Sequence, residues 1–231
     1  GQLGLGDTGD RFVPTTIPGL SVARVAAGWH HACAITLAEH AVVCWGANEH
    51  GQLGVGDTQA RGDDEAVAAL SPLPLALPVV SVSCGATHTC VTTANQTSLC
   101  WGGNAKGQLG RATTEPLGDD EPLPTEPLSI GVAAFHTAAF PHHTCVLLEH
   151  QWLKCWGSDL EGQLGLCRFE ALGDDEALDH IPPVEAGGDV AAVAGGSSST
   201  CIVRHWGAVE CWGIGAAGEV GATGPVTHRP C

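Results

Sequence analysis

Cysteines are the residues of this 231-residue chain whose type and spacing most clearly predict chemistry. Two cysteines that face each other across an antiparallel hairpin have Cα atoms about 4.5 Å apart, which is at the near edge of the range that a disulfide accepts. The spacing therefore predicts one cross-strand disulfide in each of four hairpins. The predicted pairs are Cys33 with Cys44, Cys90 with Cys100, Cys145 with Cys155, and Cys201 with Cys211.

The same pairs indicate the compartment. A disulfide that closes a loop of this size stabilises a fold by roughly 3 kcal/mol in the chain-entropy model. Reduced, buried cysteines are the alternative, but they do not explain why the pair recurs with the same turn between its members. A zinc site is disfavoured because the chain contains no Cys-x-x-Cys motif. Since disulfides persist in oxidising compartments, we expect a secreted protein that is extracellular or on the cell surface.

Three cysteines remain outside these pairs, namely Cys84, Cys167 and Cys231. An odd remainder means that at least one is free or is bonded to a chain outside this sequence. Cys231 is the last residue, and we expect it to be the one that pairs outside this sequence.

Histidines recur beside the cysteines. His31, His88 and His143 each lie two residues before the first cysteine of a pair. A ring of imidazoles would bind a metal or sense pH, but its members would have to converge across repeat units, and Ser199 interrupts the series. We expect instead that each histidine bonds a backbone carbonyl within its own unit.

Acidic loops carry the segment Gly-Asp-Asp-Glu three times. Paired carboxylates on a glycine turn are hard oxygen ligands that suit Ca²⁺. These loops lack the alternating ligand spacing of a recognised calcium loop, so we expect solvated loops and neither metal nor cofactor. The calcium alternative would use the carboxylates of Asp63, Asp64, Glu65, Asp119, Asp120, Glu121, Asp174, Asp175 and Glu176.

The sequence predicts one modification and no catalysis. Asn95-Gln96-Thr97 is a glycosylation sequon at the tip of a predicted hairpin, so we expect a glycoprotein. Residues 197–199 are three serines that lack the glycine-flanked context of a catalytic nucleophile, and no glycine loop resembles a phosphate cradle. We therefore expect a protein that is not an enzyme.

Composition narrows the class further. The chain has 25 acidic against 9 basic residues, a formal charge of -16, so its field repels phosphate backbones and nucleic acid is not an expected partner. No apolar run is long enough for membrane insertion. The 32 glycines and few charged residues suit short strands and tight turns, which predicts an all-β protein.

A repeat organises all these residues. Gly-Gln-Leu-Gly begins at Gly1, Gly51, Gly107 and Gly162, and a degenerate copy begins at Gly218, which gives periods of 50 to 56 residues. This period is typical of the blades of a β-propeller. We expect one repeat domain over residues 1–231, with units 1–50, 51–106, 107–161 and 162–217 and a partial unit 218–231.

Strands are expected at 21–27, 31–36 and 41–45 in the first unit, with the same order in later units. Because strand period is two, the tryptophan after each hairpin cysteine points to the opposite sheet face, where we expect it to pack between blades. Phe140 replaces a glycine that precedes the hairpin in the other units, and it predicts a locally remodelled blade.

The order Gly-x-x-His-x-Cys, then Cys-Trp-Gly, then Gly-Gln-Leu-Gly-x-Gly-Asp-Thr, as at residues 51–58, resembles the repeat of the regulator of chromosome condensation family. The resemblance covers essentially the whole chain, and the cysteine spacing with Gly-Asp-Asp-Glu loops is more similar to secreted members than to nuclear ones. The family implies a propeller that usually has seven blades. Four units and a partial one are too few, so we expect a fragment of a larger propeller or an open one.

The resemblance leaves three functions open. The first is a non-catalytic extracellular structural module that presents its acidic loops to a protein partner, or to neighbouring copies in an assembly. The second is a secreted propeller that inhibits an enzyme or captures a ligand. The third and weakest is a guanine-nucleotide exchange factor for a small GTPase, whose functional residues cannot be placed on this sequence.

Overall fold

The computed structural model describes residues 1–215 and contains four three-stranded antiparallel sheets, which we call blades 1 to 4. The all-β repeat fold predicted from the sequence is confirmed, and the three strands expected in the first unit match the observed ones to within a residue at each end. The strands are β1 (Val22–Ala27), β2 (His31–Thr36) and β3 (Val42–Gly46) in blade 1; β4 (Val79–Cys84), β5 (His88–Thr93) and β6 (Ser98–Gly102) in blade 2; β7 (Ala134–Ala139), β8 (His143–Leu148) and β9 (Leu153–Gly157) in blade 3; and β10 (Val190–Gly195), β11 (Ser199–Arg204) and β12 (Val209–Gly213) in blade 4.

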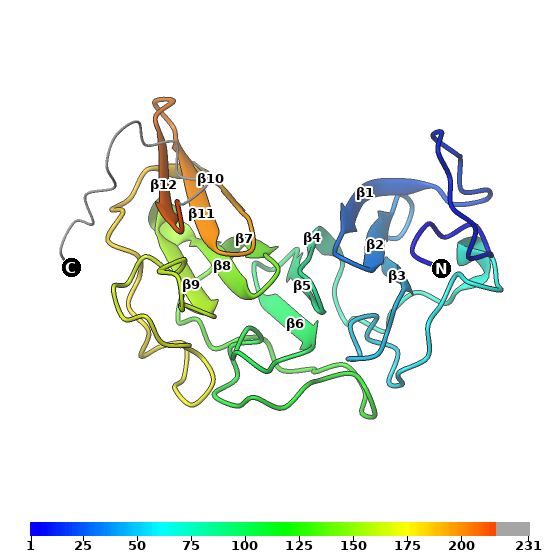
Figure 1. Ribbon diagram of the computed structural model, residues 1–231, viewed down its shortest axis with the longest axis horizontal. Helices are drawn as coiled ribbons and strands as arrows, with labels where there is room; N and C mark the ends of the chain where they lie inside the picture. Colours follow the sequence, from blue (N-terminus) through cyan, green and yellow to red (C-terminus); the bar gives the residue numbers. More distant parts are fainter. Residues whose placement is uncertain (216–231) are drawn as a thin grey trace.

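The blades follow one another along an arc, as in part of a propeller (Figure 1). The first strand of each blade lies toward the concave side, and the long loops between blades run along the convex side. Single 3₁₀ turns, η1 (Val67–Ala69) and η2 (Glu149–Gln151), are the helical elements of the described part of the chain. Within residues 1–215 no helix is long and apolar enough to cross a membrane.

The tetrapeptide Gly-Gln-Leu-Gly closes each blade by binding its tryptophan. The indole Nε1 of Trp101 donates a hydrogen bond of 3.0 Å to the backbone carbonyl of Gln52, and Trp156 does the same to Gln108. The last glycine of the tetrapeptide has positive φ and touches the indole: a Cβ on Gly54 would lie 2.7 Å from Trp101 Nε1. Only glycine fits this position without displacing the ring.

Neighbouring blades are joined by a relay through the same carbonyl. His31 Nε2 lies 2.9 Å from the hydroxyl of Thr89 in the next blade, and that hydroxyl donates a 2.8 Å hydrogen bond to the carbonyl of Gln52. Because the threonine proton is used on the carbonyl, the histidine must carry its proton on Nε2 and donate it. The relay repeats as His88–Thr144–Gln108 and His143–Thr200–Gln163.

The expectation that each histidine bonds a carbonyl of its own unit was therefore wrong. The acceptor is a threonine hydroxyl that lies about one repeat further along the chain. The series has two ends: Ala32 occupies the threonine position in blade 1, and Ser199 occupies the histidine position in blade 4.

Cysteine and tryptophan face opposite interfaces, as predicted. The disulfide of blade 1 packs in one apolar cluster with Val82, Val91 and Trp101 of blade 2. The disulfide of blade 2, Cys90–Cys100, belongs to the next cluster, which blade 2 shares with blades 3 and 4. Each interface is thus filled by the disulfide of one blade and the tryptophan face of the following blade.

Close backbone contact explains the glycine before the hairpins of blades 1 and 2. A Cβ on Gly28 would lie 2.3 Å from the carbonyl oxygen of Gly85 in the next blade, and neither residue has positive φ. In blade 3 the corresponding Phe140 is buried, with its ring 4.8 Å from the ring of His143 and against Gly195. The aromatic ring therefore fills the joint between blades 3 and 4, which is the local remodelling that the sequence indicated.

The relay predicts a cost for removing one hydroxyl. In Thr144→Val the shape is kept, but the buried Nε2–H of His88 loses its acceptor, so we expect the free energy of unfolding to fall by about 1–3 kcal/mol. In a His88→Leu background the same change leaves no donor unsatisfied and is expected to cost less. Urea unfolding of the four proteins measures this difference, and an equal cost in both backgrounds would contradict the relay.

Candidate interaction surface

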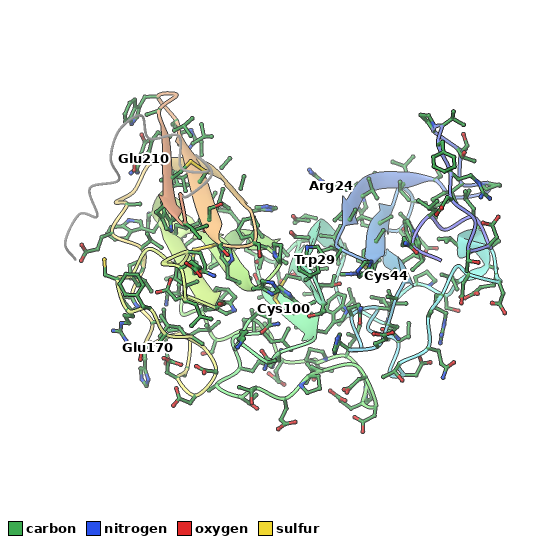
Figure 2. All side chains as sticks on the ribbon, in the orientation of Figure 1. Arg24, Trp29, Cys44, Cys100, Glu170 and Glu210 are labelled. Atoms are coloured by element: carbon green, nitrogen blue, oxygen red, sulfur yellow. A yellow bond between two sulfur atoms is a disulfide. The ribbon has the colours of Figure 1, made fainter. Side chains whose placement is uncertain are left out.

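The acidic loops lie on the convex side of the arc, where Glu170 is labelled, whereas Arg24 lies toward the concave side (Figure 2). Each loop is tied to a blade by a short antiparallel bridge between the glycine after the tryptophan and a loop residue, as between Gly102 and Leu117. The backbone of the loop then rests on the tetrapeptide of the preceding repeat unit: a Cβ on Gly51 would lie 2.5 Å from the amide nitrogen of Asp119. These anchors repeat the three acidic segments at equivalent positions.

Glutamate closes each acidic turn from within. Glu121 accepts a 2.9 Å hydrogen bond from the amide of Gly118, and Glu176 accepts one of 2.8 Å from the amide of Gly173. Both glycines have positive φ. The glutamates therefore hold the turn, while the second aspartate of each segment is exposed and the first is half-buried.

The negative charges in these turns act on one another. The hydrogen bond and the charge of Glu176 raise the pKa of the Asp175 carboxyl, and Glu65 does the same to Asp64. Carboxylate oxygens of the three acidic residues lie within 4.8 Å of one another in each loop. Clustered carboxylates of this kind attract cations and basic side chains.

A groove of about 650 Å³ lies between two of the loops. Residues 70–74 form one wall and residues 120–123 form the other, while Cys44 and Arg61 are also part of the lining. The walls combine prolines and leucines with the carboxylates of the second acidic segment. Sequence analysis missed this groove because its walls come from loops of two different repeat units.

The structure joins the sulfur atoms of the four cysteine pairs, with S–S distances of 2.05 to 2.12 Å and Cα–Cα distances of 4.1 to 4.2 Å. In each pair the two cysteines face each other in the strand register. The bridges of blades 1 to 3 are buried, and that of blade 4 is half-buried. Cys231 lies outside the described residues, whereas Cys84 is a free thiol buried at the joint between blades 1 and 2.

Asn95 is exposed at the tip of the β5–β6 hairpin. Its side-chain oxygen accepts a 2.9 Å hydrogen bond from the hydroxyl of Thr97, and a second from Thr93. The amide nitrogen is thereby turned away from the strand, which is compatible with the sequon. Glycosylation itself stays a prediction.

The relay histidines are buried and neutral. Burial lowers the pKa of His31 to about 4, and those of His88 and His143 to about 3. Each Nε2 is used on a threonine, and each Nδ1 is without a hydrogen-bond partner. Since every ring is committed to a different blade joint, the structure gives these histidines a role in joining blades.

Two protein-family models match the first half of the chain. The model of the regulator of chromosome condensation (RCC1) repeat matches residues 1–35 and 39–92, and a second model of that repeat matches residues 22–52 and 79–108. The first two repeat units are RCC1 repeats. The third and fourth units share their strand order, disulfide and tryptophan latch.

The relatives that are similar in sequence include a receptor and a ubiquitin ligase. The ultraviolet-B receptor UVR8 of Arabidopsis thaliana is 32% identical over 212 residues, which cover 89% of this chain and 44% of the receptor. The probable E3 ubiquitin-protein ligase HERC4 of Mus musculus is 30% identical over 229 residues, which cover 94% of this chain and 20% of the ligase. The chain thus spans less than half the length of either relative.

Solved structures agree on the fold. Prp20p from Saccharomyces cerevisiae superposes with a TM-score of 0.65 at 25% identity, over 92% of this chain and 49% of that one. Human WBSCR16 superposes with a TM-score of 0.67 at 21% identity, over 84% of this chain and 47% of that one. This chain covers about half of each of those structures, so its four blades are consistent with part of a larger propeller.

The buried histidines predict acid sensitivity. Below pH 6.5 the unfolded chain takes up a proton on each histidine, whereas the folded rings stay neutral down to about pH 4 or 3. Stability is therefore full above pH 6.5 and is lost as the pH falls, by up to about 1.4 kcal/mol per pH unit for each ring. Urea unfolding between pH 7 and 5, above the carboxylate range, measures this slope.

His88→Gln is expected to reduce the slope, and His205→Gln, at an exposed turn residue, is the matched control that leaves it unchanged. A free energy of unfolding that does not change between pH 7 and 5 would contradict the assignment.

Proposed function

We propose that this chain is a non-catalytic, protein-binding module of the RCC1-repeat type, which presents the acidic loops of its convex side to a basic partner. The observation that carries the proposal is the repetition of Asp-Asp pairs on turns that glutamates and tight backbone contacts hold in place. Rigid side chains at fixed spacing lose little freedom when a partner binds. The chain's formal charge of -16 favours association with positively charged proteins.

Structural relatives support a protein partner. Prp20p has binding properties toward Gsp1p and histones, and yeast RCC1 (Prp20) has also been solved in a complex with Kap60. These partners belong to those proteins. For this chain they support a function in binding proteins and supply a basic test ligand, the histones.

The groove favours a second candidate function, in which the chain captures a ligand or inhibits an enzyme. Its two walls and the carboxylates of Asp120 and Glu121 suit an extended, proline-compatible segment that carries a positive charge. The exchange-factor alternative has no comparable support, because no residue here is assigned to that activity.

We also propose that the protein belongs to an oxidising compartment, outside the cell. Buried disulfides that lie between apolar faces are difficult to reach for glutathione, and such bridges are typical of secreted domains.

Charge removal tests the acidic loops. The combined variant Asp119→Asn, Asp120→Asn, Asp174→Asn and Asp175→Asn keeps the glutamates that close the turns, so the fold is expected to persist. We expect its affinity for core histones to fall about tenfold at low salt, with a weaker dependence on salt, because each exposed charge pair contributes about 0.2–1 kcal/mol. Calorimetry at two salt concentrations measures both effects.

The control is Glu39→Gln with Glu149→Gln, which removes two exposed charges from hairpin turns outside the acidic segments, against four in the aspartate variant. If the control and the aspartate variant weaken binding equally, the acidic loops are not the docking surface.

Thiol counting tests the compartment. In protein taken from its natural source and alkylated without reductant, we expect the eight paired cysteines to be protected and Cys84 to react only after unfolding. Mass spectrometry of the alkylated chain gives the count. Free thiols at all four pairs would overturn the extracellular proposal and leave the RCC1-type fold untouched.

A further inference from the structure

A third cysteine lies beside the disulfide of blade 1. Cys84 is the last residue of β4 and faces Thr89 in the strand register of blade 2. The equivalent positions of the other blades hold Ala27, Ala139 and Gly195, which have no side chain that reaches the preceding blade. Blade 2 therefore departs from its own repeat by one sulfur atom.

The extra sulfur points out of its blade into the joint. Cys84 Sγ lies 3.7 Å from the carbonyl oxygen of Ala26 in blade 1. The sulfur atoms of Cys84 and Cys33 and a ring nitrogen of His31 all lie within 4.8 Å of one another. Cys33 is at the same time bonded to Cys44. A free thiol is thus held next to a disulfide sulfur, although the two blades are separate in sequence.

We propose that Cys33, Cys44 and Cys84 form a thiol–disulfide exchange site, which moves the disulfide of blade 1 into a covalent link between blades 1 and 2. The Cys84 thiol loses its proton, and the thiolate sulfur attacks Cys33 Sγ. The Cys33–Cys44 bond breaks as the Cys33–Cys84 bond forms, and Cys44 leaves as a thiolate that takes up a proton. One disulfide and one thiol exist before and after, so the step needs no oxidant.

Exchange places a free thiol in the lining of the groove. Cys44 is one of the residues that line the groove between residues 70–74 and 120–123, whereas Cys84 is buried in the joint. The step therefore transfers the thiol from a closed position to the wall of the candidate binding groove. It also replaces a bond within one hairpin by a bond that ties two blades together.

The surroundings of Cys84 keep this step slow at neutral pH. Burial raises the pKa of the Cys84 thiol to about 12, while the Thr89 hydroxyl and the backbone amide of Cys33 act in the opposite direction. The titratable group beside it is His31, which is neutral above about pH 4 and adds no charge. Because only the thiolate attacks, the rate of exchange rises with the thiolate fraction.

Disulfide mapping of the native chain tests the proposal. The folded protein is held at pH 7 to 10, quenched in acid, alkylated with N-ethylmaleimide after unfolding, and digested without reduction. We expect label on Cys84 at pH 7, and a growing fraction with label on Cys44 and a Cys33–Cys84 peptide as the pH rises, with an initial rate that increases about tenfold per pH unit. The Cys145–Cys155 pair must stay intact, since scrambling through unfolding would involve every pair.

A second variant makes the result independent of the exchange equilibrium. In Cys44→Ala the sulfurs of Cys33 and Cys84 are left as neighbours, and we expect hydrogen peroxide, an oxidant small enough to enter the joint, to join them as a disulfide with release of water and without unfolding the chain. Both cysteines alkylated after this treatment, in protein with an unchanged circular dichroism spectrum, would overturn the proposal.

The repeat supplies the matched controls. Cys84→Ala copies the residue of blade 3, and we expect no label to appear on Cys44 at any pH. Ala139→Cys places a thiol at the same position beside the Cys90–Cys100 bridge, and we expect exchange to begin at that joint as well. Label on Cys44 in the Cys84→Ala variant would assign the reaction to another thiol and overturn the site.

Discussion

A single backbone carbonyl holds both the blade and its neighbour. The oxygen of Gln52 accepts from the indole of its own blade and from the hydroxyl of Thr89, which in turn accepts from His31 of the preceding blade. All of these groups are buried, so each would carry a desolvation cost if its partner were lost. The carbonyl therefore fixes the position of the tryptophan, the tetrapeptide and the adjoining sheet at once. The disulfides lie in the interfaces between the sheets that this contact aligns, and the acidic loops rest on the tetrapeptides that it holds.

The disulfides stabilise single hairpins, whereas the relay stabilises the packing of one blade against the next. A bridge such as Cys90–Cys100 restricts the unfolded hairpin, whereas the relay and the apolar clusters hold one hairpin against the next. Burial of the sulfurs between blades couples the two, because a hairpin that opens also exposes the tryptophan face of its neighbour. This coupling explains how sheets of three strands, too small to bury both faces alone, bury them in a series of apolar clusters between blades.

Repetition made the fold readable from the sequence, and contacts across repeats were the part it did not reveal. The spacing of Cys33 and Cys44 predicts their pairing because both lie on one hairpin, where register is local. The partner of His31 was misassigned because its acceptor lies in the next unit, although Thr89, Thr144 and Thr200 recur at one position and offered a signal. Cys84 carried no such signal, since it occurs once and its neighbours come from another blade. The groove was hidden for the same reason.

The relay also makes the two sides of each blade different. Every joint uses a histidine donor from the earlier blade and a threonine acceptor from the later one, so a blade has a distinct leading and trailing side. Ala32 cannot accept and Ser199 has no imidazole to donate. Blades 2 and 3 carry both groups and can therefore form the relay on both sides. Blade 1 lacks the threonine and blade 4 lacks the histidine, so each can form it on one side. Two side chains per unit therefore determine the orientation in which one blade can pack against the next.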